Sequence, residues 1–190
     1  MSKLFKEPDK DNLYTALSHL VLTAISARGA LNNLGGPYVH PGVHVNYFIH
    51  GILGFFAHQE KLLNIHLKDA YRISLMATRC LALPCLNAEL FRDQRELSAL
   101  FLVSGVLPFI LVILKEDVSE ITHVTIVVNI CALAYWAIKN EREWGYYATG
   151  ASLLAYFATL PAPRIAYPLG LALFNFCIYR IYRINTSSPP

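Results

Sequence analysis

Uncharged apolar runs recur along this chain, and short polar segments separate them. The clearest run, residues 97–114, reads LSALFLVSGVLPFILVIL and contains no charged side chain. A helix rises about 1.5 Å per residue, so a run of this length reaches about 27 Å. That is close to the roughly 30 Å of hydrocarbon in a bilayer. Charged residues lie on both sides of the run, at 92–96 and 115–117. The pattern predicts a membrane-spanning helix.

The other apolar runs extend this prediction to an all-α fold, a polytopic membrane bundle of about seven transmembrane helices. The predicted spans are residues 13–31, 43–60, 70–88, 97–114, 121–138, 144–160 and 165–183. Residues 1–12 and 184–190 are predicted to be polar tails. The assignment of 70–88 has an alternative, a re-entrant or interfacial helix. Arg79 lies in the middle of this segment, where a charge costs about 2.5–3.5 kcal/mol on insertion scales, and Pro84 should kink it.

The composition supports a membrane protein. Hydrophobic residues make up 55% of the 190 residues and charged residues only 15%, whereas roughly 25% of a typical soluble domain is charged. The net charge of +3 is spread over the loops, so we expect no nucleic-acid partner, which needs Lys and Arg gathered on one face. We expect the lipid bilayer and other membrane proteins as partners. The first residues, MSKLFKEPDKDN, contain no apolar h-region, so we expect no cleavable signal peptide.

Small and polar residues form stripes inside the predicted helices, which favours close helix packing in lipid. One stripe follows a 4-3-4-3 spacing and consists of Gly145, Thr149, Ser152, Tyr156 and Thr159. A second consists of Thr122, Thr125 and Asn129. Pro108 should bend its helix and free the carbonyl of Ser104, because proline has no N–H to donate. The four cysteines have no metal-site spacing and are expected to pack as small apolar side chains.

Histidines are the densest candidates for chemistry. Five of the seven lie between residues 40 and 66. His40 and His44 have the H-x-x-x-H spacing that, on a helix, places two imidazoles on one face for a metal. Pro41 and Gly42 between them indicate a turn instead of a helix. We therefore keep two interpretations of His40 and His44, as metal ligands and as interfacial or packing residues, and we expect no bound cofactor.

Asn46, His50 and Arg79 are the candidate ligand-binding residues. Asn46, His50 and Gly54 recur every four residues and so share a helix face. This face should point into the bundle, because an unsatisfied polar group facing lipid is costly. An ionisable group inside a predicted span is a functional hypothesis by default.

His19 and His123 also lie within predicted spans. One interhelical hydrogen bond would satisfy a neutral imidazole, and the asparagines of other spans offer partners. These are Asn46, Asn129 and Asn175. Packing through such bonds is the alternative to a binding role for every buried histidine.

Residues 15–22, TALSHLVL, open the first predicted helix. This opening, with the chain length and the multi-pass layout, resembles the transmembrane protein 276 family. The resemblance covers eight residues and implies a polytopic endomembrane protein. It contributes no catalytic residue.

The motifs of common enzyme classes are missing from the sequence. There is no Gly-rich phosphate loop, no G-x-S-x-G elbow and no H-E-x-x-H. The first hypothesis is therefore a non-enzymatic multi-pass membrane protein, a structural, assembly or regulatory component of the endoplasmic reticulum or another endomembrane. The alternative is a membrane-embedded enzyme or transporter for a lipid or small apolar ligand, with Asn46, His50 and Arg79 facing one cavity.

Overall fold

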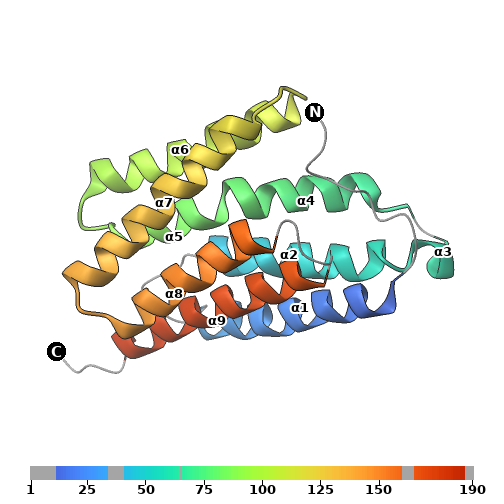
Figure 1. The fold of residues 1–190 in the computed structure, drawn as a ribbon, viewed down its shortest axis with the longest axis horizontal. Helices are drawn as coiled ribbons and strands as arrows, with labels where there is room; N and C mark the ends of the chain where they lie inside the picture. The colour runs from blue at the N-terminus through green and yellow to red at the C-terminus, as the bar shows by residue number, and fades with distance from the viewer. Residues whose placement is uncertain (1–11, 34–40, 65, 160–164, 187–190) are drawn as a thin grey trace.

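The computed structural model describes residues 12–33, 41–64, 66–159 and 165–186, and all regular structure within these ranges is helical. The all-α prediction is confirmed for this part of the chain. Figure 1 shows most of the helices lying lengthwise in one bundle. They are α1 (Leu13–Asn33), α2 (Pro41–Ala57), α3 (Glu60–Leu63), α4 (Lys68–Cys80), α5 (Ala82–Leu90), α6 (Arg95–Ile113), α7 (Ser119–Lys139), α8 (Glu143–Leu153), the π-helical turn η1 (Leu154–Ala158) and α9 (Ala166–Thr186).

The bundle has two sides joined by a central pair of helices. α6 and α7 lie at one side, α1 and α9 lie at the other, and α4 and α5 run between them (Figure 1). The helix contacts agree with this arrangement, since α1 packs on α2 and α9, α2 packs on α4, and α5 packs on α6 and α7. α2 therefore lies between α1 and α4.

The start of α2 corrects one prediction. Pro41 and Gly42 are the first residues of α2, so the turn predicted for them is wrong. Proline suits the first turn of a helix, because its missing N–H is not needed there and its fixed φ is helical. His44 consequently lies on a helix, in the first turn of α2. His40 lies outside the described residues, so its pairing with His44 at a metal stays a prediction.

The predicted span 70–88 is two helices, α4 and α5, which meet at Leu81. Pro84 has no N–H to donate to the carbonyl of Cys80, four residues earlier, and the helix is interrupted there. Gly105 of α6 crosses at this point. A Cβ on Gly105 would lie 2.5 Å from the carbonyl oxygen of Cys80 and 2.7 Å from Cγ of Pro84. A glycine is therefore needed for α6 to pack this closely on the interruption.

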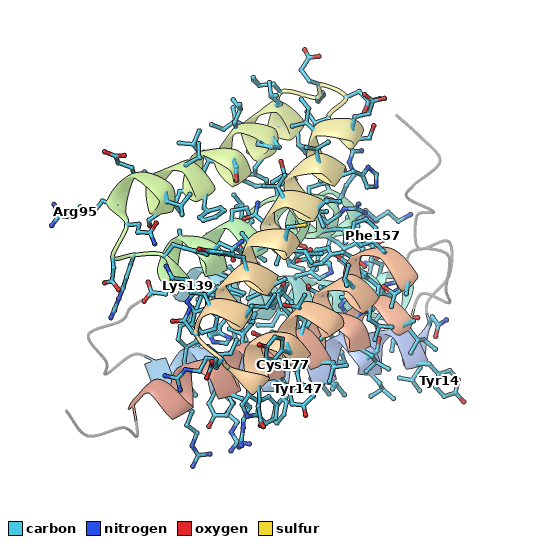
Figure 2. All side chains as sticks on the ribbon, turned by 60° about the vertical axis from the view of Figure 1, so that its left-hand side comes forward. Tyr14, Arg95, Lys139, Tyr147, Phe157 and Cys177 are labelled. Atoms are coloured by element: carbon cyan, nitrogen blue, oxygen red, sulfur yellow. The ribbon has the colours of Figure 1, made fainter. Side chains whose placement is uncertain are left out.

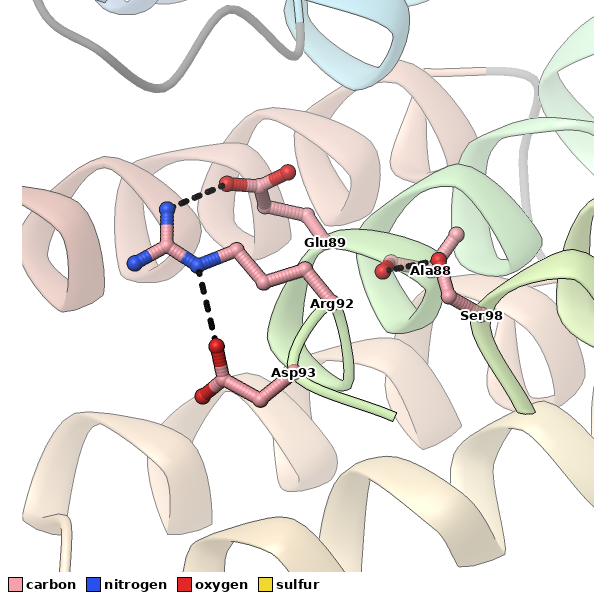
Figure 3. A network of polar contacts seen from close by, with 5 residues as sticks. All are labelled: Ala88, Glu89, Arg92, Asp93 and Ser98. Atoms are coloured by element: carbon pink, nitrogen blue, oxygen red, sulfur yellow. Dashed lines mark hydrogen bonds and ion pairs between the residues drawn. The ribbon is translucent and has the colours of Figure 1, made fainter. Parts of the chain in front are cut away.

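The turn between α5 and α6 is held by short polar contacts (Figure 3). Nη1 of Arg92 lies 3.7 Å from Oε1 of Glu89, and its Nε lies 3.9 Å from Oδ1 of Asp93. The hydroxyl of Ser98 donates to the carbonyl of Ala88 at 2.7 Å. Glu89 is buried, whereas Arg92 and Asp93 are exposed, and an exposed pair such as Arg92–Asp93 contributes only about 0–1 kcal/mol.

The carbonyl of Ser104 is used as the sequence suggested. Thr125 donates its hydroxyl hydrogen to this carbonyl across the α6–α7 contact at 3.4 Å, and Nδ2 of Asn129 reaches Oγ of Ser104, also at 3.4 Å. Asn129 in turn accepts two hydrogen bonds from Nδ2 of Asn87 on α5, each 2.8 Å long. The polar stripe of α7 thus joins three helices, which is the packing role expected for it.

Apolar side chains cover much of the surface, while polar side chains fill much of the interior. Tyr14 and Tyr147 extend away from the bundle (Figure 2), 72% and 59% exposed. On α6 the exposed large apolar residues are Leu100, Leu102, Val103, Val106, Leu107, Ile110 and Ile113. The fully buried polar residues include His19, Ser26, His44, His50, Thr78, Asn87, Asn129, Ser152 and Asn175. α6 and α7 are long and apolar enough to cross a membrane by length and composition, and the other five spans stay a prediction.

Candidate functional site

Histidines from α1 and α2 meet inside the bundle. The ring centroid of His19 lies 5.2 Å from that of His50 and 5.5 Å from that of His58, which follows α2. Tyr71 of α4 lies against all three rings, at centroid distances of 5.6, 5.1 and 5.7 Å in the same order. His19 and His50 are fully buried. We call His19, His50, His58 and Tyr71 the histidine cluster.

Hydrogen bonding fixes the tautomer of His50. The hydroxyl of Ser74 donates its one hydrogen to the carbonyl of Tyr71 at 2.8 Å. Oγ of Ser74 must therefore accept the hydrogen of Nδ1 of His50, 2.9 Å away. A neutral imidazole carries one hydrogen, so Nε2 of His50 is a bare lone pair. This nitrogen is buried and has no hydrogen-bond partner in the described part of the chain.

His19 faces His50 from α1 and also has an open nitrogen. Its Nε2 lies 3.4 Å from the hydroxyl of Tyr71, while its Nδ1 is buried and has no partner within the described ranges. Gly54 of α2 makes room for this ring, because a Cβ at Gly54 would overlap the imidazole of His19. The predicted stripe of α2 therefore does face the interior at His50 and Gly54.

His44 belongs to a different contact. Its Nδ1 donates to Oδ1 of Asn175 on α9 at 2.6 Å, and Nδ2 of Asn175 donates to Oγ of Ser26 on α1 at 2.7 Å. Nε2 of His44 is left open, as is the hydroxyl of Tyr182, whose ring centroid lies 6.3 Å from that of His44. An asparagine thus serves as a histidine partner, but no second described histidine joins His44 in a metal pair.

A network of tyrosines links α2, α4, η1 and α9, and each of its hydroxyl groups donates to an acceptor. Tyr156 donates to the carbonyl of Thr78 at 2.8 Å, so Tyr47 must donate to the hydroxyl of Tyr156 at 2.9 Å. Thr78 donates to the carbonyl of Leu75 at 2.7 Å, so Tyr167 must donate to Thr78 at 3.3 Å. Because no hydroxyl hydrogen is left to donate to a ligand, we interpret this network as a packing contact between helices.

Of the three predicted ligand-binding residues, His50 and Arg79 lie in the same part of the interior. Arg79 is buried, and Thr78 directly before it is hydrogen-bonded to Tyr156 and Tyr167. The ring of His50 contacts Tyr167 as well, at a centroid distance of 6.4 Å. Asn46 is half-buried and forms no hydrogen bond to the described residues of the histidine cluster.

Sequence reasoning placed His58 only within the histidine-rich segment 40–66 and did not select Tyr71. The repeat of His50, Gly54 and His58 every four residues could have indicated His58, because such positions share a helix face. Tyr71 carries no local signal, since only the packing of α4 on α2 brings it to the cluster. His123, by contrast, makes only a local bond from the ring Nδ1 to the carbonyl of Ser119 at 2.7 Å.

The described histidines, cysteines and acidic residues form no group of three that could hold a metal ion. The four cysteines are free, with Cys80 and Cys177 buried. Comparison of the chain with protein-family models, with curated proteins and with solved structures finds no match. The resemblance of residues 15–22 to the transmembrane protein 276 family therefore stays an expectation. Any functional argument must come from the histidine cluster and the surface.

Proposed function

We propose that this chain is a multi-pass membrane protein that binds a small ligand in the polar interior of its helical bundle. The observation that carries this proposal is the set of open nitrogens inside the bundle, Nδ1 of His19 and Nε2 of His44 and His50. Leaving a buried polar atom without a partner costs about 1–3 kcal/mol. A bound molecule that supplies the missing hydrogen bonds would recover that free energy.

The membrane part of the proposal is supported by the surface. Only 17% of the apolar stretch of α6 is buried within the bundle, and exposed apolar side chains continue on α1, α7, α8 and α9. Soluble monomers rarely expose contiguous apolar patches above a few hundred Å². Such a surface is favourable in contact with hydrocarbon. Inside a membrane bundle, buried polar contacts are expected to hold the helices together. We extend this argument to all seven predicted spans.

Native mass spectrometry of the full chain in mild detergent tests the ligand-binding role. We expect a bound small molecule on the wild-type protein, which His50→Ala loses and His123→Ala retains. His123 is the matched control because its ring is only half-buried and bonds within its own helix. A chain that carries no small molecule, or one that keeps it in both variants, would contradict the proposal.

A second candidate function is assembly with another membrane protein, and α6 favours it. Its apolar side chains point outward over most of the helix, where a partner helix as well as lipid can pack. The same mass spectra would then show a stoichiometric polypeptide, and abundance would fall in both His50→Ala and Arg79→Ala through lost packing. Residence in the endoplasmic reticulum or another endomembrane is part of the proposal, and fluorescence microscopy of the tagged chain tests it.

A further inference from the structure

The open nitrogens of His19 and His50 define what kind of molecule the histidine cluster can accept. Nε2 of His50 is a lone pair, because Ser74 holds the ring hydrogen on Nδ1. It can only accept a hydrogen bond from a ligand. Nδ1 of His19, on the neighbouring ring, is the second open atom. The ligand must therefore bring a hydrogen donor to this point.

Charged groups fit this point poorly. A carboxylate has no hydrogen to give to Nε2 of His50, so lone pairs would face each other. An ammonium group would add a positive charge to an interior that already contains the guanidinium of Arg79, and no described carboxylate contacts His19 or His50. Burying such a charge without a paired acid is costly. A neutral group with its own hydrogen is favoured.

The depth of the cluster indicates where that group comes from. His19 lies six residues after Leu13, the first residue of α1, which corresponds to about 9 Å along the helix axis. His50 lies seven residues before Ala57, the last residue of α2, or about 10 Å. Both histidines lie inside the predicted spans 13–31 and 43–60, and therefore within the hydrocarbon of the proposed bundle. A ligand that reaches this depth from the lipid must be largely apolar apart from one neutral donor group, as an alcohol on a hydrocarbon tail is.

We infer that His19 and His50 bind the hydroxyl group of a lipid alcohol, with the ligand hydroxyl donating to Nε2 of His50. This inference rests on the proposed membrane bundle and names the class of ligand that the bundle binds. The hydroxyl oxygen can accept a hydrogen bond while its hydrogen is donated to Nε2 of His50. Tyr71 encloses the site from α4 through its ring contacts with His19 and His50.

Tail-matched probes test the inference on the full chain in phosphatidylcholine nanodiscs. Radiolabelled 1-hexadecanol is bound, and unlabelled 1-hexadecanol, hexadecyl methyl ether, hexadecylamine and palmitate compete for it. We expect saturable binding of hexadecanol and at least about tenfold weaker competition by the ether, which has the same tail and oxygen but no donor hydrogen, a loss of about 1.4 kcal/mol. Equal competition by ether and alcohol, or stronger competition by the amine or by palmitate, would overturn the inference.

Variants provide the second arm of the experiment. His50→Phe keeps an aromatic ring but removes the lone pair, and we expect hexadecanol affinity to fall at least about tenfold, while His123→Phe leaves it unchanged. Nitrogen NMR of the histidine-labelled wild-type protein reads the tautomer directly, so the inference does not depend on a variant that folds. A His50 ring with its hydrogen on Nε2 would overturn it.

The outcome for the ligand is separable from the outcome for the membrane bundle. Extraction of the native membranes with alkaline carbonate tests whether the chain is integral. If the chain stays in the pellet but hexadecanol does not bind saturably, the alcohol site is wrong and the membrane bundle stands. If carbonate releases the chain, the membrane bundle itself is wrong.

Discussion

Replacement of Gly105 by alanine is the sharpest test of the packing around the α4–α5 interruption. The added Cβ would lie 2.5 Å from the carbonyl oxygen of Cys80, while ordinary contacts of a Cβ begin near 3.4 Å. The difference of 0.9 Å must come from movement of α6 or α5. A backbone carbonyl and the ring of Pro84 are both rigid, so no side-chain rotation relieves the overlap.

The expected cost follows from measured overpacking in protein cores. Extra methyl groups in a tightly packed site destabilise by about 1–3 kcal/mol, which is about a 5- to 150-fold change in the unfolding equilibrium. Gly150→Ala is the matched control, because a Cβ there meets no atom within 4 Å. It makes the same chemical change inside α8 and should be neutral or stabilising by up to about 1 kcal/mol, from the better helix propensity of alanine.

The assay is equilibrium unfolding of both variants in mixed micelles of mild detergent and dodecyl sulfate. Tryptophan fluorescence reports the transition, since Trp136 is buried in the core and Trp144 packs against Phe176 of α9. We expect Gly105→Ala to unfold at a lower dodecyl sulfate fraction than the wild type, and Gly150→Ala to unfold at the same fraction or a higher one. Equal midpoints for the two variants would refute the close crossing of α6 on the interruption.

Three further predictions concern the polar contacts. Asn87→Leu should destabilise by about 1–2 kcal/mol through loss of both bonds to Asn129, and a double-mutant cycle with Asn129→Leu that is additive within about 0.5 kcal/mol would contradict it. Tyr156→Phe should lower the unfolding midpoint more than Tyr47→Phe, because only Tyr156→Phe leaves a buried hydroxyl, that of Tyr47, without an acceptor. The reverse order would refute the assigned directions of the hydrogen bonds between the tyrosines. Hydrogen bonds from Ser119 hold the pKa of the exposed Asp117 below 3.8. The difference in stability between the wild type and Asp117→Asn should therefore be present above about pH 4 and shrink as the pH falls through that lower pKa. A difference that does not change with pH would contradict this stabilising role of the Asp117 carboxylate.

The long apolar helices could be predicted because a long uncharged run satisfies its own backbone hydrogen bonds as one continuous helix. The run 97–114 is α6 within two residues at its N-terminus and one at its C-terminus. The two extra residues, Arg95 and Glu96, extend the first turn, since an acidic side chain is favourable at a helix N-terminus. Hydropathy marks where the apolar run begins, but Arg95 and Glu96 belong to the same helix, so the helix begins two residues before the run.

Proline produced both the correct and the incorrect local predictions. Pro84 was expected to kink its span, and the interruption lies at Leu81, next to the carbonyl that loses its donor. The sequence predicts a turn at Pro41, whereas this residue is the first of α2. The same residue type ends one helix and begins another, because its missing N–H matters only where a carbonyl four residues earlier needs it. That context depends on the preceding chain.

The histidine cluster could be predicted only in part. His50 and Arg79 were selected because ionisable groups inside apolar segments are rarely neutral to function. His19 is a candidate for the same reason, but its contact with His50 could not be predicted, since periodicity describes one helix and cannot say which helix lies beside it. The contact of His19 with His50 exists because Gly54 lets α1 approach α2, and Tyr71 arrives from α4 by tertiary packing alone.

The direction of each hydrogen bond distinguishes packing contacts from binding atoms in this interior. In the tyrosine network every hydroxyl hydrogen is donated to an acceptor within the protein. The network therefore joins helices and has no hydroxyl hydrogen left to donate to a ligand. In both His44 and His50, the bond from Nδ1 to a neighbour leaves Nε2 as a buried lone pair. Phenylalanine at His50 removes the uncompensated nitrogen, which favours the folded state, together with the bond to Ser74, whose hydroxyl keeps its own acceptor. An increase in stability of His50→Phe together with a loss of hexadecanol binding would therefore show that the open nitrogen serves the ligand and not the fold.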